Sequence, residues 1–185
     1  MARERIGIFG GTFDPVHVGH LVIASECLHV LELDRLAVVP SASPPHKPDQ
    51  KLSDSADRFA MLALAIHERP RLTVDSIEFE REGPSFTVDT LREYHRREPG
   101  ADLTFIMGAD SLRELHLWRD PAGILAQAEV AVARRPGVAI DLDEVDARIP
   151  GASSRIRIVD VPLIGVSSSD IRRRIREDEP IAYQV

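Results

Sequence analysis

The 185-residue sequence contains one cysteine, one tryptophan and two tyrosines, and only 5% of its residues are aromatic. With Cys27 alone, no disulfide can form within the chain, which fits a reducing compartment such as the cytoplasm. Cys27 lies in a predicted helix and is interpreted as a small buried hydrophobic residue. No apolar run is long enough to cross a bilayer, and charges at Arg3, Glu4 and Arg5 precede the first strand, which argues against a signal peptide. We therefore expect a cytoplasmic protein without a membrane partner.

Positive charge is also scarce. The chain has 23 Lys and Arg residues against 30 Asp and Glu residues, a net charge of -7 at pH 7. Such a surface repels nucleic acid and acidic lipid, so neither is expected as a partner. With 43% hydrophobic and 29% charged residues, the composition is that of an ordinary globular protein. The length predicts one domain over residues 1–185.

Short apolar runs typical of buried strands alternate with helical patterns along the chain. Strands are expected at residues 6–9, 36–39, 72–74, 77–79, 103–107, 130–133 and 156–159, and helices at about 19–31, 54–68, 87–96 and 168–176. This alternation predicts an α/β fold, a Rossmann-like doubly wound parallel sheet with helices on both faces in three α/β/α layers. Ligands of such folds bind beyond the carboxyl ends of the strands, where the strand order reverses.

The first strand is followed by GGTFDPVHVGH, residues 10–20, which we call the glycine–histidine turn. Gly10 and Gly11 let backbone amides approach an anion, and the helix N-terminus that follows favours negative charge. His17 and His20 are three residues apart and can share one helix face. Neutral or protonated imidazoles beside amide donors suit phosphoryl transfer. For a pair of histidines in this turn, that interpretation is preferred to simple helix capping.

Two common phosphate-binding motifs are absent from this turn. Gly7, Gly10 and Gly11 do not form G-x-G-x-x-G, and no Gly-Lys-Ser/Thr follows as in a Walker loop. Near the end of the chain, Ser167, Ser168 and Ser169 precede Asp170-Ile171-Arg172, and we call residues 167–172 the serine turn. Its hydroxyls, free amides and Arg172 favour a second phosphate site, although capping alone explains one serine. The later arginines 173, 174 and 176 are interpreted as solvated charges.

Other candidates allow two interpretations each. Asp110, in the turn after the strand at 103–107, either accepts hydrogen bonds from a nucleoside or caps the next helix. Trp118 either stacks on a ligand ring or belongs to the core. Lys47, in the proline-rich loop 41–53, is either a phosphate-binding cation or an exposed lysine. Ser85 and Thr87 form a helix start in which either residue can be the cap, and this capping is compatible with ligand contact.

Taken together, these motifs resemble the H-x-G-H nucleotidyltransferases with an adenylyltransferase-type Rossmann fold, and within them the nicotinate mononucleotide adenylyltransferase family. The similarity rests on the glycine–histidine turn and on SPPHK (43–47), GPSFTVDTL (83–91), GADS (108–111), Trp118, RRPG (134–137) and VSSSDIR (166–172). H-x-G-H alone identifies only the superfamily, whereas the proline-lysine, Ser-Phe-Thr and serine segments are far more specific. Arg119 stands where the family often has a second aromatic, and Phe86 where tyrosine is commoner.

The resemblance implies a role for each of these segments. It assigns catalysis to His17, His20, Lys47 and Arg172. It assigns ATP binding to Gly10, Gly11, Thr12, Phe13, His17, His20, Gly108, Asp110, Arg134, Ser167, Ser168, Ser169 and Arg172. It assigns the nicotinate mononucleotide to Lys47, Ser85, Thr87 and Trp118, with the tryptophan stacked on the pyridine ring.

The implied reaction joins ATP and nicotinate mononucleotide into nicotinate adenine dinucleotide and pyrophosphate, a step of NAD synthesis. Mg²⁺ would travel with the ATP phosphates, because the sequence shows no clustered acidic ligands and hence no protein metal site. Asp14 is interpreted as stabilising the turn before Pro15. The family also continues past residues 180–185 into one more helix. Two alternatives remain, a phosphopantetheine adenylyltransferase and a non-catalytic nucleotide sensor on the same scaffold.

Overall fold

A computed structural model describes residues 3–44 and 52–185 and contains one six-stranded sheet in which every described pairing is parallel. Its strands are β1 (Arg5–Gly11), β2 (Arg35–Pro40), β3 (Leu72–Val74), β4 (Asp102–Gly108), β5 (Glu129–Arg134) and β6 (Ile156–Asp160). They lie in the order β3-β2-β1-β4-β5-β6. The order therefore reverses between β1 and β4, whose carboxyl ends form the expected ligand-binding edge.

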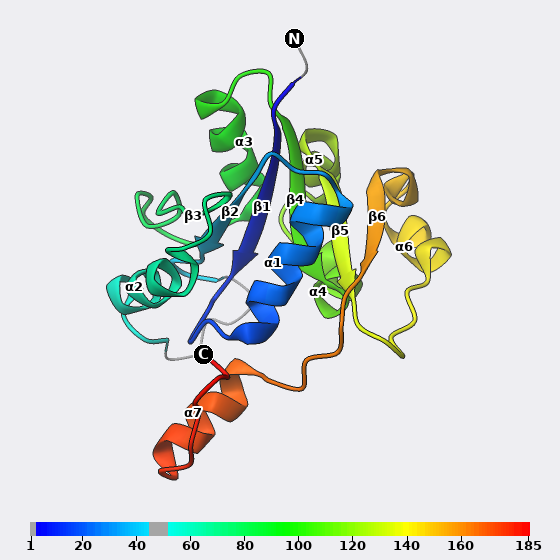
Figure 1. Ribbon diagram of the computed structural model, residues 1–185. Helices are drawn as coiled ribbons and strands as arrows, with labels where there is room; N and C mark the ends of the chain where they lie inside the picture. The colour runs from blue at the N-terminus through cyan, green and yellow to red at the C-terminus, as the bar shows by residue number, and fades with distance from the viewer. Residues whose placement is uncertain (1–2, 45–51) are drawn as a thin grey trace.

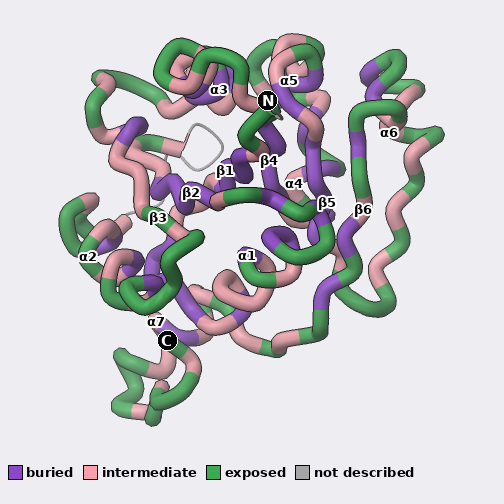
Figure 2. The backbone as a smooth tube through the Cα atoms, turned by 45° about the horizontal axis from the view of Figure 1, so that its top comes forward, coloured by how far each residue is buried: buried purple, intermediate pink, exposed green. Residues whose placement is uncertain are grey.

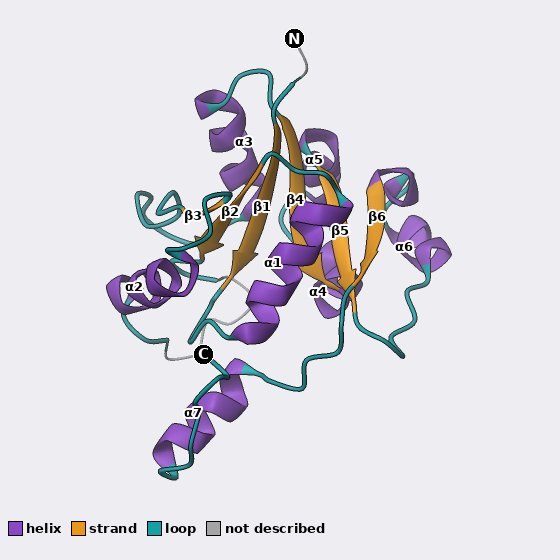
Figure 3. Ribbon diagram, in the orientation of Figure 1, coloured by secondary structure: helices purple, strands orange, loops and turns teal. Residues whose placement is uncertain are grey.

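Helices cover both faces of this sheet, as Figures 1 and 3 show. One face carries α1 (Val18–Val30) and α2 (Ser55–Ile66), and the other carries α3 (Thr87–Arg97), α4 (Ala109–Glu114) and α5 (Pro121–Gln127). Beside β6 lies α6 (Leu142–Arg148), whereas α7 (Ser168–Arg176) stands beyond the carboxyl end of β1. Short 3-10 helices span Leu115–Leu117 and Ala152–Arg155. The predicted three-layer α/β fold is confirmed.

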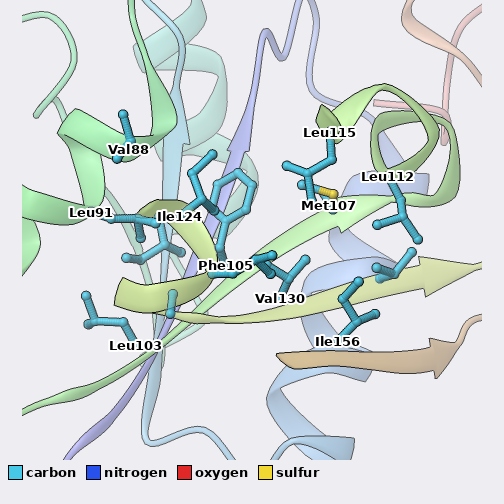
Figure 4. Packing of buried hydrophobic residues seen from close by; sticks show 14 of the residues in the cluster. Val88, Leu91, Leu103, Phe105, Met107, Leu112, Leu115, Ile124, Val130 and Ile156 are labelled. Atoms are coloured by element: carbon cyan, nitrogen blue, oxygen red, sulfur yellow. The ribbon is translucent and has the colours of Figure 1, made fainter. Parts of the chain in front are cut away.

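Side chains that point alternately to the two faces of the sheet form two separate hydrophobic clusters. In β4, Leu103, Phe105 and Met107 pack with α3, α4 and α5, as Figure 4 shows for the labelled residues, whereas Ile106 points into the cluster beneath α1 and α2. Successive side chains of a strand point to opposite faces, so a strand covered on both faces is apolar throughout. Cys27 is fully buried in the second cluster and burial raises the pKa of its thiol to about 12, which confirms its interpretation as a core residue. Figure 2 shows buried residues gathered in the strands.

One predicted strand is wrong. Residues 77–79 lie in a turn, because the Asp75 carboxylate accepts a hydrogen bond from the Ile77 amide at 2.9 Å and the Phe79 amide bonds to the Ser76 carbonyl at 2.7 Å. An aspartate that binds the backbone two residues ahead competes with strand pairing. Within the described residues, no helix has the length and apolar character needed to span a membrane.

Candidate active site

A cavity of about 300 Å³ lies at the carboxyl ends of β1, β2 and β4. It brings together predicted residues from distant segments, namely Gly10, Gly11, Thr12, His20, Ser85, Thr87 and Trp118. The glycines let the strand end come close to other groups: a Cβ on Gly11 would lie 2.9 Å from the Phe13 ring, and one on Gly10 would lie 3.3 Å from Phe105. Glycine at these two positions therefore allows the Phe13 and Phe105 rings to pack against the end of β1, next to the cavity.

The two histidines of the glycine–histidine turn are stacked. His17 is the N-cap residue of α1 and His20 lies one turn inside, with ring centroids 3.7 Å apart. The His17 amide donates to His20 Nδ1 at 3.2 Å. Because Nδ1 accepts, a neutral His20 ring carries its proton on Nε2 and keeps one donor free of the helix end. The predicted shared helix face is confirmed. The pair also caps α1, which is the interpretation that the sequence did not favour, and ligand contact stays a prediction.

Burial fixes the charge state of this pair. Desolvation, followed by repulsion from His17, lowers the pKa of His20 to about 3. Burial also lowers the pKa of His17. Both imidazoles are therefore neutral at pH 7, which narrows the choice left open by the sequence between neutral and protonated donors.

This charge state makes stability depend on pH. The His20 pKa is about 3 in the folded protein and 6.5 when unperturbed. Below pH 6.5 the unfolded chain takes up more protons, so the free energy of unfolding falls with pH by up to about 1.4 kcal/mol per unit. Chemical denaturation measures the free energy of unfolding at pH 7 and at pH 5. Between these two pH values we expect a His20→Gln variant to lose about 2 kcal/mol less of this free energy than the wild-type protein. Equal losses of stability in the variant and the wild type would contradict the assignment of a neutral His20. The raised pKa of the Glu78 carboxyl also makes stability depend on pH, but it affects both proteins equally.

The serine turn meets the glycine–histidine turn directly. Ser168 Oγ donates to the Pro15 carbonyl at 2.9 Å, and the Arg172 guanidinium donates to the Asp14 carbonyl. Ser167 caps α7 by accepting from the Asp170 amide at 3.2 Å, as predicted. Two segments about 150 residues apart in the sequence are thus held side by side by hydrogen bonds.

Asp14 and Phe13 are two of the buried residues of the glycine–histidine turn. Asp14 is 2% exposed, and its carboxylate accepts from the Ser53 amide at 3.3 Å, which joins the turn to the end of the 41–53 loop. Phe13 is 1% exposed and packs edge-on against His20 with centroids 4.9 Å apart. Its ring is therefore enclosed by protein, and only its backbone remains for the predicted contact with ATP.

Ser85, Thr87 and Trp118 also line the cavity. The indole of Trp118 packs edge-on against Phe105, with centroids 6.1 Å apart, and is half-buried. The prediction that Ser85 or Thr87 caps α3 is wrong, because Phe86 occupies the N-cap position. The Ser85 hydroxyl instead accepts from the Ser43 amide at 3.2 Å. This bond holds the start of the 41–53 loop against the segment that precedes α3.

Comparison with known proteins identifies the family. Residues 8–174 match the model of the cytidylyltransferase-like family. A probable nicotinate-nucleotide adenylyltransferase of Thermomicrobium roseum is 44% identical over 182 residues, which cover 98% of this chain and 85% of that protein. Another from Thermus thermophilus is 41% identical over 181 residues, covering 98% and 91%. The chain belongs to the nicotinate-nucleotide adenylyltransferase family. Nicotinate-nucleotide adenylyltransferases are nucleotidyltransferases, so the chain is an enzyme of this class.

Solved structures agree with this family on the fold. A Plasmodium falciparum nicotinic acid mononucleotide adenylyltransferase complexed with NaAD aligns with a TM-score of 0.80 at 18% identity, covering 97% of this chain and 87% of that one. At this identity the match bears on the fold, and the nucleotidyltransferase fold expected from the sequence is confirmed.

Most residues that the nicotinate-nucleotide adenylyltransferase resemblance assigns to ATP do not line the cavity, namely Phe13, His17, Gly108, Asp110, Arg134, Ser167, Ser168, Ser169 and Arg172. Asp110 is in the first turn of α4 and pairs with Arg113 at 3.2 Å and Arg135 at 3.6 Å. Its alternative role as helix cap is wrong, since Gly108 holds that position. Arg134 binds Asp160 through two hydrogen bonds of 2.7 and 2.9 Å, an exposed pair at the end of β5. Both ATP contacts remain predictions.

The sequence did not single out two buried charges of this adenylyltransferase site. Glu78 is 7% exposed and lines the cavity, and burial raises the pKa of its carboxyl despite bonds from Thr90, Ser85 and Ser41. Arg58 is 1% exposed. Neither stands in a motif with a chemical signature, so only the fold reveals them. Lys47 lies outside the described residues.

Proposed function

We propose that this chain transfers the adenylyl group of ATP to nicotinate mononucleotide, giving nicotinate adenine dinucleotide and pyrophosphate in NAD synthesis. The observation that carries the proposal is the joining of the serine turn to the glycine–histidine turn beside the cavity. Family membership supplies the substrates, because relatives about 40% identical carry the name nicotinate-nucleotide adenylyltransferase.

In this reaction the two reactants supply the chemistry and the protein supplies position and charge. An oxygen of the acceptor 5′-phosphate attacks the α-phosphorus of ATP, and the bond to the bridging oxygen of pyrophosphate breaks. No protein nucleophile is required, and a phosphate dianion needs no strong base. His20 donates its Nε2–H to phosphate oxygens as charge develops, and His17 holds the ring of His20 in place.

The remaining predicted residues divide between the two substrates. For ATP we assign backbone donors and phosphate ligands at Gly10, Gly11, Thr12, Phe13, Ser167, Ser168, Ser169 and Arg172, and nucleoside contacts at Gly108, Asp110 and Arg134. For nicotinate mononucleotide we assign Ser85, Thr87 and Trp118, with Lys47 binding phosphate during transfer. Ser85, Thr87 and Trp118 line the same cavity as Gly10, Gly11, Thr12 and His20. This shared cavity supports the binding of acceptor and ATP beside each other.

A divalent metal accompanies ATP in such reactions, and we propose Mg²⁺ carried on the phosphates. Within residues 3–44 and 52–185, no three His, Cys, Asp or Glu side chains cluster as a metal site would require. An ion held by the nucleotide would neutralise phosphate charge. We place the reaction in the cytoplasm, where ATP is abundant and the buried Cys27 stays reduced.

An acceptor assay tests this function. The purified protein is incubated with ATP, MgCl₂ and either nicotinate mononucleotide or phosphopantetheine, and products are separated by chromatography. We expect nicotinate adenine dinucleotide and pyrophosphate in equal amounts from the first acceptor. A product only with phosphopantetheine would contradict the substrate, and ATP binding without any turnover would indicate a nucleotide sensor.

A further inference from the structure

Arg58 of α2 is among the largest fully buried side chains, with 1% of it exposed. Its guanidinium donates to three backbone carbonyls: Nε to Ser53 at 3.1 Å, and Nη1 to Thr12 at 2.9 Å and to Ser41 at 2.7 Å. A buried cation is costly unless it is hydrogen-bonded, and a planar fork of donors meets several fixed acceptors at once. The three peptide groups are thus held by one side chain.

Two of these carbonyls belong to the wall of the nucleotide cavity. Thr12 follows β1 within the glycine–histidine turn, and Ser41 follows β2, and both residues line the cavity. The carbonyl and the next amide of a peptide share one rigid plane. Fixing the Thr12 and Ser41 carbonyls therefore fixes the direction of the amides that follow them and the width between the two strand ends.

Asp14 also contacts the Ser53 residue that Arg58 binds. Its carboxylate accepts from the Ser53 amide at 3.3 Å while Arg58 binds the Ser53 carbonyl at 3.1 Å. The charge of Asp14 also offsets the burial of the guanidinium. Phe79, next to the cavity residue Glu78, has its ring centroid 5.6 Å from the centre of the guanidinium. Arg58 thus contacts the glycine–histidine turn, both ends of the 41–53 loop and the ring of Phe79.

We propose that Arg58 is a positioning residue for adenylyl transfer, which sets the spacing and peptide orientation of Thr12 and Ser41 so that ATP phosphates meet the backbone donors correctly. This inference rests on the proposed function. Arg58 acts through the peptides that it holds, without touching the nucleotide. A lysine retains the charge but cannot satisfy three carbonyls arranged around a planar fork.

The test compares two destabilised proteins. Arg58→Lys alters the clamp, and Ile66→Ala opens a cavity at the far end of the same helix, at a residue that is 4% exposed and outside the nucleotide cavity. Both are expected to lower the melting temperature. We measure kcat/KM for ATP at a temperature well below both melting points, with nicotinate mononucleotide as the acceptor. We expect it to fall about tenfold or more in Arg58→Lys and to stay near the wild-type value in Ile66→Ala, because small displacements of the reacting groups slow the reaction strongly.

Each outcome decides the role of Arg58. If Arg58→Lys folds and keeps kcat/KM within twofold of wild type, or if Ile66→Ala loses as much, Arg58 has only a structural role. Should Arg58→Lys not fold in buffer, it is refolded and assayed beside wild type in an osmolyte such as sucrose, which favours the compact state. A kcat/KM about tenfold lower than that of wild type in the same osmolyte supports the proposal, and a value within twofold contradicts it. Wild-type turnover in the same assay tests the proposed function separately.

Discussion

Replacing His20 with alanine is expected to lower kcat by about 10³-fold while the protein remains folded. The His20 ring reaches the cavity from the first turn of α1, and its Nδ1 is already occupied by the His17 amide at 3.2 Å. Alanine removes the Nε2–H donor and leaves the rest of the site in place. Pre-positioned donors in a site shielded from water contribute strongly to transition-state stabilisation, so the loss falls on kcat.

The matched control lies on the same helix. His29 is exposed in the last turn of α1, and His29→Ala is expected to keep wild-type kcat. Steady-state pyrophosphate release, with circular dichroism to verify folding, measures both variants. A His20→Ala protein that turns over at the wild-type rate would rule out the proposed catalytic role of His20.

The neutral state of His20 adds a second expectation to that experiment. Because burial lowers its pKa to about 3, the wild-type rate should show no loss from protonation of His20 between pH 8 and pH 6. A catalytic imidazole with an ordinary pKa near 6.5 would lose about half of its neutral form at pH 6.5. The proposed donor role of His20 therefore requires no base at the histidine pair.

Local sequence signals predicted the segments that create the site. The α7 helix begins and ends at the predicted residues 168 and 176, because a serine cap precedes a short amphipathic run. The central strand β4 extends only one residue beyond the prediction at each end, since strands buried on both faces are apolar throughout. The position of the glycine–histidine turn at a strand end followed from the same pattern.

The remaining features either are too short to give a periodic pattern or depend on contacts between distant residues. The seven-residue helices α5 and α6 were not predicted, because their starts depend on caps at Asp120 and Asp141 and their length gives little periodicity. The charge state of the histidines depends on burial by the whole fold. Arg58 stands in an ordinary helical pattern, and its partner carbonyl at Thr12 is 46 residues away. Such clamps have no signature in the sequence.

Substitution of Arg172 by alanine is expected to lower kcat/KM for ATP by about 10²-fold. Its guanidinium donates to the Asp14 carbonyl and lies 3.4 Å from Ser169 Oγ, so it joins the serine turn to the glycine–histidine turn. Loss of the side chain removes the proposed phosphate ligand and one of the two hydrogen bonds that join the turns. Ser168 still bonds to Pro15, which should keep α7 in place.

Two further variants separate these contributions. Arg176→Ala removes an exposed charge at the end of α7 and controls for net charge, with kcat/KM expected to stay at the wild-type value. Arg172→Lys keeps a cation near the phosphates but loses the planar donors that bridge Asp14 and Ser169, so recovery should be partial. If Arg172→Ala and Arg176→Ala behave alike, the serine turn does not bind the triphosphate. If lysine restores full activity, charge alone explains the contribution of Arg172, and its bridge between the turns is dispensable.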